Sequence, residues 1–310
     1  MAEISYLSLV AFKTLINKGA EMTEEGKNSS DHTDSADQDN AKFWNYLCGT
    51  NAAVYMGFDL DTKTGVSGFD AWYMDFYPYL RPYIDKTTLG SITCLEVGIG
   101  LGTVSRYLAR NVDEFTALDV APEPGIFLEK SLRTENVKLN AVNRSILEGT
   151  VSTPLGDRFD SAIAIGSLHH SGNLELALDN LISSVKPGGK ILIMIYNEFS
   201  LYRLFNNPRR FLSHLISSLL KKSYSWSEKD KSVRAVNDSN DQGVAAPHTA
   251  YSSKQLFYSR VDSTWTVNSE NISDFALFGV RFHRKNLLPF VRIAGGLDLY
   301  ASGVKSADPV

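Results

Sequence analysis

The sequence predicts an α/β fold, with helices on both faces of a doubly wound, mostly parallel sheet. Three observations lead to this prediction. Between residues 90 and 200, short apolar runs alternate with helical patterns, as in successive strand–helix units. A glycine-rich turn at 98–102 joins the first apolar run to the first helix. A Lys-Pro-Gly-Gly run at 186–189 ends the last of these helices and turns the chain into another buried strand.

The composition is that of an ordinary globular chain, with 43% hydrophobic and 21% charged residues. The formal net charge of -4 gives no bulk attraction for nucleic acid, so we expect no nucleic-acid partner. Cys48 and Cys94 lack the spacing of a disulfide framework or a metal site, which favours the cytoplasm and no bound metal. We find neither an export signal nor an apolar run of about eighteen residues, and therefore expect no membrane span.

The first part of the chain is expected to lie outside the sheet. Residues 1–18 place apolar side chains at helical spacing and predict an amphipathic helix, in a monomer or pairing two copies in a homodimer. Residues 19–40 are almost entirely polar and predict a flexible linker. Residues 41–89 predict a helical lid of aromatic-rich segments, interrupted at Pro78 and Pro82.

Residues 90–198 and 272–310 are expected to form the core, and residues 199–271 a helical insertion that caps the substrate. A final pair of strands, 275–284 and 297–304, is expected to close the sheet, with an antiparallel last strand. The elements predicted before them are strands at 92–97, 115–119, 137–142, 159–165 and 190–196, and helices at 103–110, 125–133 and 174–185.

The insertion holds an amphipathic segment, 211–220, between basic residues at Arg209, Arg210, Lys221 and Lys222. A helix of this kind packs on the core with its charged ends in water, or rests peripherally on an anionic membrane surface. We favour the first interpretation and keep the second open.

The turn after the first strand carries the strongest chemical signal. Glu96 ends the strand and offers a carboxylate to a hydroxyl or a cation. Glycines follow at 98, 100 and 102, where they let the turn pass close under a ligand. A dinucleotide site places its third glycine one position later, where this chain has Thr103. The spacing therefore disfavours a nicotinamide or a flavin.

Together with three later motifs, this turn resembles class I S-adenosylmethionine-dependent methyltransferases of the small-molecule type. An acidic residue, Asp119, ends the second strand. The run Phe-Asp-Ser-Ala-Ile-Ala-Ile-Gly-Ser-Leu-His-His at 159–170 is similar to the family's fourth-strand motif, and 186–189 to its fifth-strand turn. The resemblance implies a Rossmann-like fold with S-adenosylmethionine as cofactor and S-adenosylhomocysteine as product.

The resemblance also implies the cofactor contacts. Asp119 is implied to accept both ribose hydroxyls, whereas the alternative is a strand-end Asp that caps a turn. After the third strand, Asn143 stands where the family usually has an Asp that meets the adenine amino group, and Ser145 is its rival. The implied set is Glu96, Gly98, Ile99, Gly100, Gly102, Asp119, Val120, Asn143, Ser145, Ile146, Gly166, Ser167 and Leu168.

Candidate bases follow the fourth and fifth strands. A neutral imidazole at His169 or His170 accepts a proton near pH 7, or else one of the two merely holds the loop by a hydrogen bond. We expect His170 to be the base if the acceptor needs one. Asn197 and Glu198 lie in a Tyr-Asn-x-x-Ser-Leu-Tyr run that resembles a subset of the family. They either face the acceptor, with Glu198 as a second candidate base, or cap the next helix.

Two further fragments resemble the same subset, at 43–50 and at 247–253. They imply side chains around the acceptor, whereas aromatic residues at helical spacing are the alternative of ordinary core packing. The substrate-pocket candidates are Trp44, Thr50, Tyr73, Asn197, His248 and Tyr251.

The implied function is methyl transfer from S-adenosylmethionine to a small molecule, with a specialised metabolite as the preferred acceptor and oxygen, nitrogen and carbon all open. The alternatives are a sugar or lipid-linked glycan intermediate, a peptide, and a non-catalytic cofactor-binding subunit. Glu96, the three glycines and Asp119 are all present, which disfavours the last. An activated donor needs mainly orientation of the reactants, worth on the order of 7 kcal/mol or more, so no catalytic triad is expected.

Overall fold

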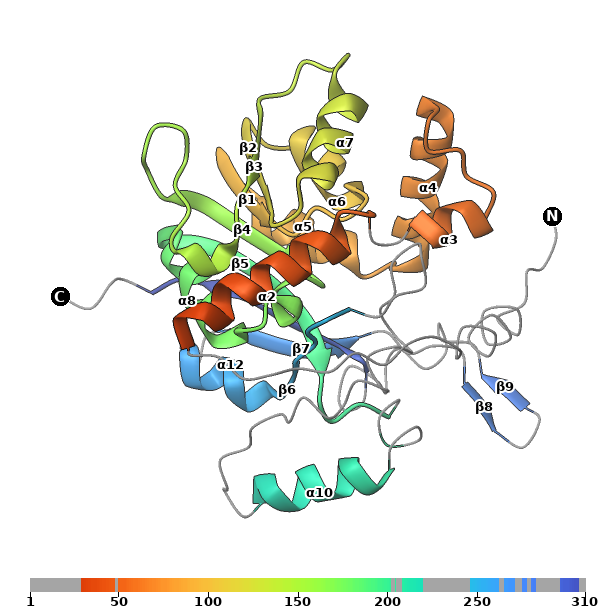
Figure 1. The fold of residues 1–310 in the computed structure, drawn as a ribbon, viewed down its shortest axis with the longest axis vertical. Helices are drawn as coiled ribbons and strands as arrows, with labels where there is room; N and C mark the ends of the chain where they lie inside the picture. Colours follow the sequence, from red (N-terminus) through yellow and green to blue (C-terminus); the bar gives the residue numbers. More distant parts are fainter. Residues whose placement is uncertain are drawn as a thin grey trace.

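In the computed structural model, residues 29–47, 50–201, 204, 208–219, 246–261, 265–270, 275–277, 280–282 and 296–306 are described. They build a mixed sheet of eight strands with helices on both faces, which confirms the predicted α/β class (Figure 1). The helix predicted for 1–18 lies outside the described residues.

The principal strands follow the order β3-β2-β1-β4-β5-β10-β7 across the sheet. Neighbours from β3 to β5 are parallel, whereas β10 is antiparallel to both β5 and β7. The chain winds outward from β1 in one direction and from β4 in the other, so a topological switch point lies between these two strands. The strands are β1 (Thr93–Val97), β2 (Glu114–Asp119), β3 (Leu139–Asn143), β4 (Phe159–Ile165), β5 (Val185–Asn197), β7 (Thr266–Glu270) and β10 (Asp298–Val304).

The central strands are apolar because both faces of the sheet are covered. On one face of β5, Leu192 and Met194 pack in a cluster with residues of α5, α6 and α7. On the other face, Ile191 and Ile193 pack in a cluster with residues of α8 and α12. The sheet is thus covered on both faces, so a register error in a central strand would exchange the side chains that face the two cores. These helices are α5 (Leu80–Thr88), α6 (Thr103–Ala109), α7 (Pro122–Leu132), α8 (Leu174–Ser183) and α12 (Lys254–Arg260).

The Lys-Pro-Gly-Gly run does not end before β5 but forms a bulge inside it. Val185 pairs with Phe159, and the next partners are Lys190 and Ser161, so four residues oppose one on the partner strand. Gly188 has φ 78°, a conformation that glycine adopts without steric cost. The turn chemistry was therefore identified correctly, but β5 begins five residues earlier than the predicted strand.

The predicted linker over 19–40 is wrong for its second part, because residues from Ser29 onward are helical in α2 (Ser29–Trp44). The polar composition of this segment predicts no stable helix on its own. The helix forms because Ala36, Asn40 and Phe43 recur on one of its sides and are buried by tertiary contacts. Residues 19–28 lie outside the described part of the chain.

The predicted lid consists of α3 (Thr50–Tyr55), α4 (Lys63–Phe76) and α5. Pro78 separates α4 from α5 as expected. Pro82, in contrast, lies inside the first turn of α5, where a missing N–H breaks no intrahelical bond. Only one of the two predicted interruptions is therefore real.

The last strands differ from the prediction. β10 closes on β5 as expected, but its outer neighbour is β7, which the sequence analysis had assigned to the insertion. The segment predicted as a long strand at 275–284 holds instead two short strands, β8 (Phe275–Leu277) and β9 (Val280–Phe282), in a separate hairpin. β7 was missed because Val267 is its only apolar residue, so the segment shows no strand-like alternation of apolar and polar residues.

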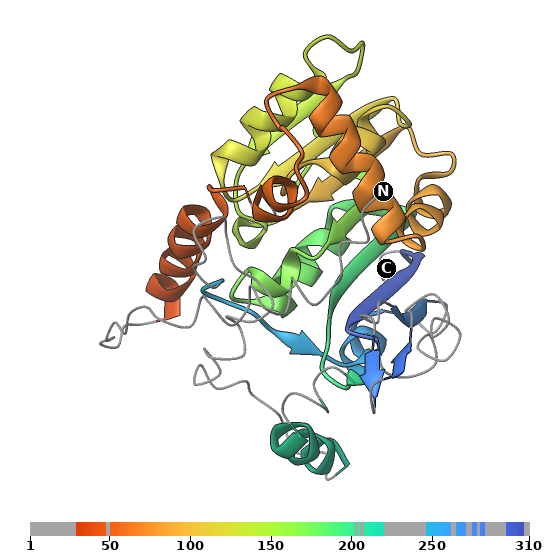
Figure 2. The same cartoon turned by 90° about the vertical axis from the view of Figure 1, so that its right-hand side faces the viewer.

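The insertion contains α10 (Pro208–Leu219), which lies away from the sheet in two perpendicular views (Figures 1 and 2). Leu212 and Ile216 on this helix are exposed. A short strand, β6 (Tyr251–Ser252), then returns to the sheet and pairs with the end of β5. None of the helices in the described ranges has the length and apolarity needed to cross a bilayer.

Candidate cofactor and acceptor site

The predicted site residues converge at one edge of the sheet. β1, β2, β4 and β5 are parallel, so their carboxyl ends and the loops that follow them share this edge. β6 runs parallel beside the end of β5, where β4 has already turned away, and brings the 246–252 segment to the same edge.

The glycine turn owes its shape to left-handed backbone at each glycine. Gly98 has φ 88°, and a Cβ there would lie 2.2 Å from the Cβ of Ser167, so the loops after β1 and β4 pack together only around glycine. Gly100 has φ 53°, and a Cβ there would meet no atom within 4 Å. The turn is thus tightly packed at its start and open at its middle, as a ligand cradle requires.

The Glu96 side chain lies beneath this turn and is only 2% exposed. Its Oε2 has no hydrogen-bond partner among the described residues. The pKa of the carboxyl is raised to about 8. Burial is the main cause and the charge of Asp119 adds to it, whereas Ser105 and the positive charge of Arg106 partly oppose the rise. A buried carboxyl oxygen without a partner is costly, and a ligand that donates a hydrogen bond or carries positive charge removes that cost.

Asp119 fastens the glycine turn to the next helix. Its Oδ2 accepts a hydrogen bond from the Ile99 N–H at 2.8 Å, and its Oδ1 accepts one from the Ala121 N–H at 2.9 Å. Burial raises the pKa of this carboxyl, and the backbone donors oppose the rise. The capping alternative is therefore observed, and the predicted contact of Asp119 with the ribose hydroxyls remains a prediction.

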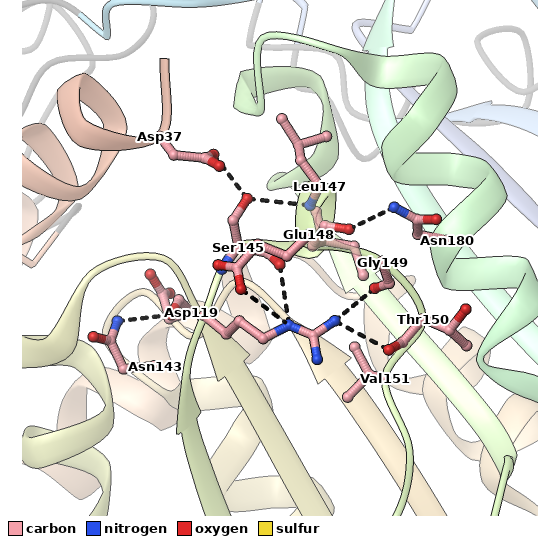
Figure 3. A network of polar contacts seen from close by, with 12 residues as sticks. Asp37, Asp119, Asn143, Ser145, Leu147, Glu148, Gly149, Thr150, Val151 and Asn180 are labelled. Atoms are coloured by element: carbon pink, nitrogen blue, oxygen red, sulfur yellow. Dashed lines mark hydrogen bonds and ion pairs between the residues drawn. The ribbon is translucent and has the colours of Figure 1, made fainter. Parts of the chain in front are cut away.

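The loop after β3 is held by the polar network in Figure 3. Asn143 donates from Nδ2 to the carbonyls of Asp119 and Val120, at 3.1 and 2.9 Å. This fixes the amide and turns its oxygen away from those carbonyls, as the predicted adenine contact requires. Ser145 instead donates to Asp37 at 2.7 Å and accepts from the Leu147 N–H at 3.1 Å, so its hydroxyl is engaged within the protein.

The loop after β4 begins at Gly166, which has φ 72° and donates from its N–H to the Met194 carbonyl. Ser167 donates to the Val97 carbonyl and so ties this loop to the glycine turn. Leu168 packs in the main apolar core, as does Ile146. Both side chains are buried there, and their predicted contacts with the cofactor remain predictions.

His170 holds two loops together. Its Nδ1 lies 2.9 Å from the carbonyl oxygen of His248, which only accepts, so Nδ1 carries a proton. Thr249 approaches the same nitrogen at 3.2 Å, and the Trp44 ring packs 5.0 Å from the imidazole. This geometry supports the loop-holding alternative for His170, and its predicted role as a base remains a prediction, because a proton on Nδ1 leaves Nε2 as the proton-accepting nitrogen.

His169 has the opposite environment. Its imidazole is only 1% exposed, and neither ring nitrogen has a hydrogen-bond partner in the described part of the chain. It packs 4.3 Å from the ring of Tyr196 and 4.1 Å from that of His170. Burial, and then the neighbouring His170, hold the pKa of His169 well below its usual 6.5, so the ring is neutral at physiological pH.

Hydrogen bonds fix Asn197, the last residue of β5, and Glu198, which follows it. Asn197 donates from Nδ2 to the Gly296 carbonyl at 2.8 Å and accepts from the Phe199 N–H at 3.1 Å. Glu198 is buried, and its N–H donates to the Ser252 carbonyl at 2.8 Å. These bonds hold the Asn197 side chain within the protein, and the predicted roles of Asn197 in the pocket and of Glu198 as a base remain predictions.

The remaining pocket candidates divide between two places. Trp44, His248 and Tyr251 gather at the loops after β4 and β5, the last with its ring 5.7 Å from Tyr196. Thr50 donates to a carbonyl of the turn before α3, and Tyr73 packs in the aromatic cluster of α4. The packing of Tyr73 agrees with the alternative of ordinary core packing, and the predicted pocket roles of Thr50 and Tyr73 remain predictions.

Sequence reasoning missed several buried polar residues near this edge. Asp298 and Glu270 lie directly opposite one another on β10 and β7, and accept hydrogen bonds from Tyr79 at 3.3 Å and Tyr83 at 3.0 Å. The only sequence signal was a pair of tyrosines in the lid segment, which give no indication of their distant partners. Among the described residues, no group of three or more His, Cys, Asp or Glu side chains is arranged to hold a metal ion.

The strand order, the antiparallel β10, the glycine turn after β1 and the carboxylate at the end of β2 agree with the fold and motifs that the resemblance to class I methyltransferases implies. Residues 95–193 match the family described as "Methyltransferase domain". The chain therefore contains a methyltransferase domain over this segment.

Curated relatives cover the same part of the chain. A ubiquinone biosynthesis O-methyltransferase of Rickettsia akari is 29% identical over 113 residues, which are 36% of this chain and 42% of that protein. A demethylmenaquinone methyltransferase of Tropheryma whipplei is 28% identical over 131 residues, 41% of this chain and 51% of that protein. The chain thus spans about half the length of the curated relatives it matches.

Solved structures are more distantly similar. The N-methyltransferase NodS of Bradyrhizobium japonicum, in complex with S-adenosylhomocysteine, has 19% identity and a TM-score of 0.35, over 42% of this chain and 68% of that one. The DhpI–SAM–HEP complex has 15% identity and a TM-score of 0.44, over 77% and 92%.

Proposed function

We propose that this chain transfers the methyl group of S-adenosylmethionine to a small-molecule acceptor. The observation that carries the proposal is the buried Glu96 carboxyl, with an unpartnered oxygen, beneath a glycine turn that is open at Gly100. This edge of the sheet combines space for a ligand with an unsatisfied acidic group, which suits a cofactor bearing an ammonium, hydroxyls and a sulfonium. The methyltransferase match over 95–193 supports the same assignment.

The residues present fit the cofactor. Asp119 and Asn143 offer oxygens at the ends of β2 and β3, where a ribose and an adenine would lie, and Glu96 offers one at the end of β1. When bound, S-adenosylmethionine supplies an already activated methyl group. The protein's contribution is therefore to hold the acceptor in line and to exclude water, worth on the order of 7 kcal/mol or more of the barrier.

His169 is better suited to orient the acceptor than to remove its proton. Its depressed pKa makes the imidazole a weak proton acceptor, and a nearby sulfonium would depress it further. Its two unpartnered nitrogens instead provide one donor and one acceptor for an O–H or N–H on the acceptor molecule. Glu198 remains the candidate base for an acceptor that must lose a proton early.

A small-molecule acceptor is supported by relatives whose names are a ubiquinone biosynthesis O-methyltransferase and a demethylmenaquinone methyltransferase. Within that class we propose a specialised metabolite, methylated in the cytoplasm on oxygen, nitrogen or carbon, with no nucleic-acid partner. The net charge of -4 is consistent with the last point.

Calorimetric titration tests the cofactor assignment before any acceptor is known. We expect saturable binding of S-adenosylmethionine and of S-adenosylhomocysteine, and no response to NADH. Binding of NADH alone would overturn the proposal. Incubation with methyl-labelled S-adenosylmethionine and fractionated small-molecule extracts then identifies the acceptor, and label found only in protein would redirect the assignment to a peptide substrate.

A further inference from the structure

We infer that helix α2 is a strap over the cofactor site and that Asn40, within it, binds the nucleoside part of the ligand through its amide oxygen. This inference rests on the proposed function, because it concerns the same ligand. It adds a binding element from outside residues 95–193, the segment that matches the methyltransferase family.

Three contacts fix α2 beyond the carboxyl ends of the parallel strands, where it appears in red in Figure 2. Near its middle, Asp37 accepts a hydrogen bond from Ser145 in the loop after β3. At its end, the Trp44 ring packs on His170 in the loop after β4. Just past the end of α2, Asn45 accepts a hydrogen bond at 3.3 Å from the backbone N–H of Glu123, in the first turn of α7, the helix that follows β2. One helix thus spans the loops from three strands that border the cofactor site.

Asn40 lies between these anchor points, on the side of α2 that faces the protein. It is only 2% exposed, and its Oδ1 has no hydrogen-bond partner in the described ranges. The preceding turn brings Ala36 against Gly172, since a Cβ added to that glycine would lie 3.1 Å from the alanine Cβ. Leaving a buried amide oxygen without a hydrogen bond is unfavourable, and a donor on a bound ligand would remove that cost.

The anchor at Ser145 indicates which part of the ligand Asn40 meets. The loop after β3, which Asp37 grips, also carries Asn143, the residue we expect near the adenine. An adenosine group offers an exocyclic amine and two ribose hydroxyls, all of them hydrogen-bond donors, and a lone amide oxygen is complementary to such a group. The amino-acid part of the cofactor would lie instead toward Glu96, at the end of β1.

The sequence of α2 makes it depend on this docking. Nine of its 16 residues are Ser, Thr, Asp or Asn, which compete with helical hydrogen bonds, and an isolated helix of this length is marginal even with good helix formers. The helix is therefore held by its contacts with the site loops. By linkage, a ligand that hydrogen-bonds Asn40 stabilises docked α2, and a docked α2 strengthens binding of the ligand.

Two measurements on the full chain test the inference. Hydrogen exchange is recorded with and without S-adenosylhomocysteine, and we expect exchange of the α2 amides to slow several-fold with ligand. Calorimetry then compares the wild type with Asn40→Leu, which keeps the side-chain size but removes the amide. We expect about tenfold weaker binding of S-adenosylhomocysteine and of 5′-methylthioadenosine. Gln38→Ala, at an exposed position of the same helix, serves as the control and should change neither readout.

The outcomes separate the two proposals. A wild-type chain that fails to bind S-adenosylhomocysteine overturns the proposed function and the strap with it. A wild type that binds, with unchanged α2 exchange and with equal affinity in Asn40→Leu, overturns the strap alone. Slower α2 exchange in the wild type supports the strap even if the leucine variant fails to fold, because that measurement needs no substitution.

Discussion

Replacing Asp70 by alanine should lower the free energy of unfolding by about 3 kcal/mol, because it leaves the buried Arg106 guanidinium without its acidic partner. Asp70, on α4, accepts hydrogen bonds from Nε and Nη2 of Arg106 at 2.7 and 2.5 Å, and a third from Thr103 at 2.7 Å. The Arg106 side chain is 2% exposed and its Nη1 has no hydrogen-bond partner among the described residues. Removing one partner of a buried ion pair costs about 3–5 kcal/mol, and we take the lower value because Asp70 is 19% exposed.

Urea and thermal unfolding of Asp70→Ala, Arg106→Met and the double variant measure this energy. The expected loss corresponds to a fall in Tm of about 6–12 °C for a chain of this size. The double variant should be more stable than the sum of the single losses by at least about 2 kcal/mol, since it leaves no stranded charge. Arg106 lies beside Gly102, so Asp70→Ala should also weaken S-adenosylhomocysteine binding.

Glu135→Ala is the matched control, because Glu135 makes a comparable two-point ion pair with the partly exposed Arg110. A pair open to solvent contributes about 1 kcal/mol or less. If Asp70→Ala costs no more than this control, the reasoning that α4 is fastened to α6 by a buried ion pair is refuted.

Three further predictions concern the site. Gly100→Val should abolish cofactor binding. Gly156→Val is the control, because Gly156 also has a left-handed backbone (φ 87°) with no atom within 4 Å of an added Cβ; it should lose similar stability and leave binding intact. Equal binding in both variants would show that the cradle is misplaced. The pKa of Glu96 is raised to about 8, so the carboxyl stays protonated in the folded protein at pH values where it ionises in the unfolded chain. Its contribution to the free energy of unfolding is therefore fully present below pH 4.5 and is lost as the pH rises through 8. A cationic ligand favours the ionised form of Glu96, so cofactor binding should release a proton and become tighter from pH 6 to 8. Calorimetry in two buffers of different ionisation enthalpy detects the released proton. Glu96→Gln should remove the pH dependence, and a wild type whose affinity does not change with pH would contradict the assignment. His170→Ala should speed hydrogen exchange and proteolysis of residues 246–252 at nearly unchanged cofactor affinity, and full protection of that segment would argue against the loop-holding role.

Local sequence patterns were sufficient where neighbouring residues decide the structure. β4 was predicted with its observed bounds because its apolar run is continuous and ends at glycine. The glycine turn was recognisable because left-handed backbone at three alternate positions admits little besides glycine. Asp119 followed at the end of the next strand, since parallel strands of similar length bring their ends to one edge.

Local patterns failed where a distant contact decides. The choice between His169 and His170 depends on which ring meets the His248 carbonyl, 78 residues away in the chain. β7 is a strand because β10 pairs with it, although its own residues are largely polar.

The fold class, the glycine turn at 98–102 and the nearby carboxylates Glu96 and Asp119 could be predicted from the sequence, because they follow from backbone sterics and strand periodicity within a short window. The folded structure was needed to show that the polar 29–44 segment is helical, that Asn40 Oδ1 and the His169 ring nitrogens are buried with no hydrogen-bond partner among the described residues, and that Arg106 pairs with Asp70. Burial and pairing are properties of surfaces that meet across the fold, and no single stretch of the sequence contains both sides of such a contact.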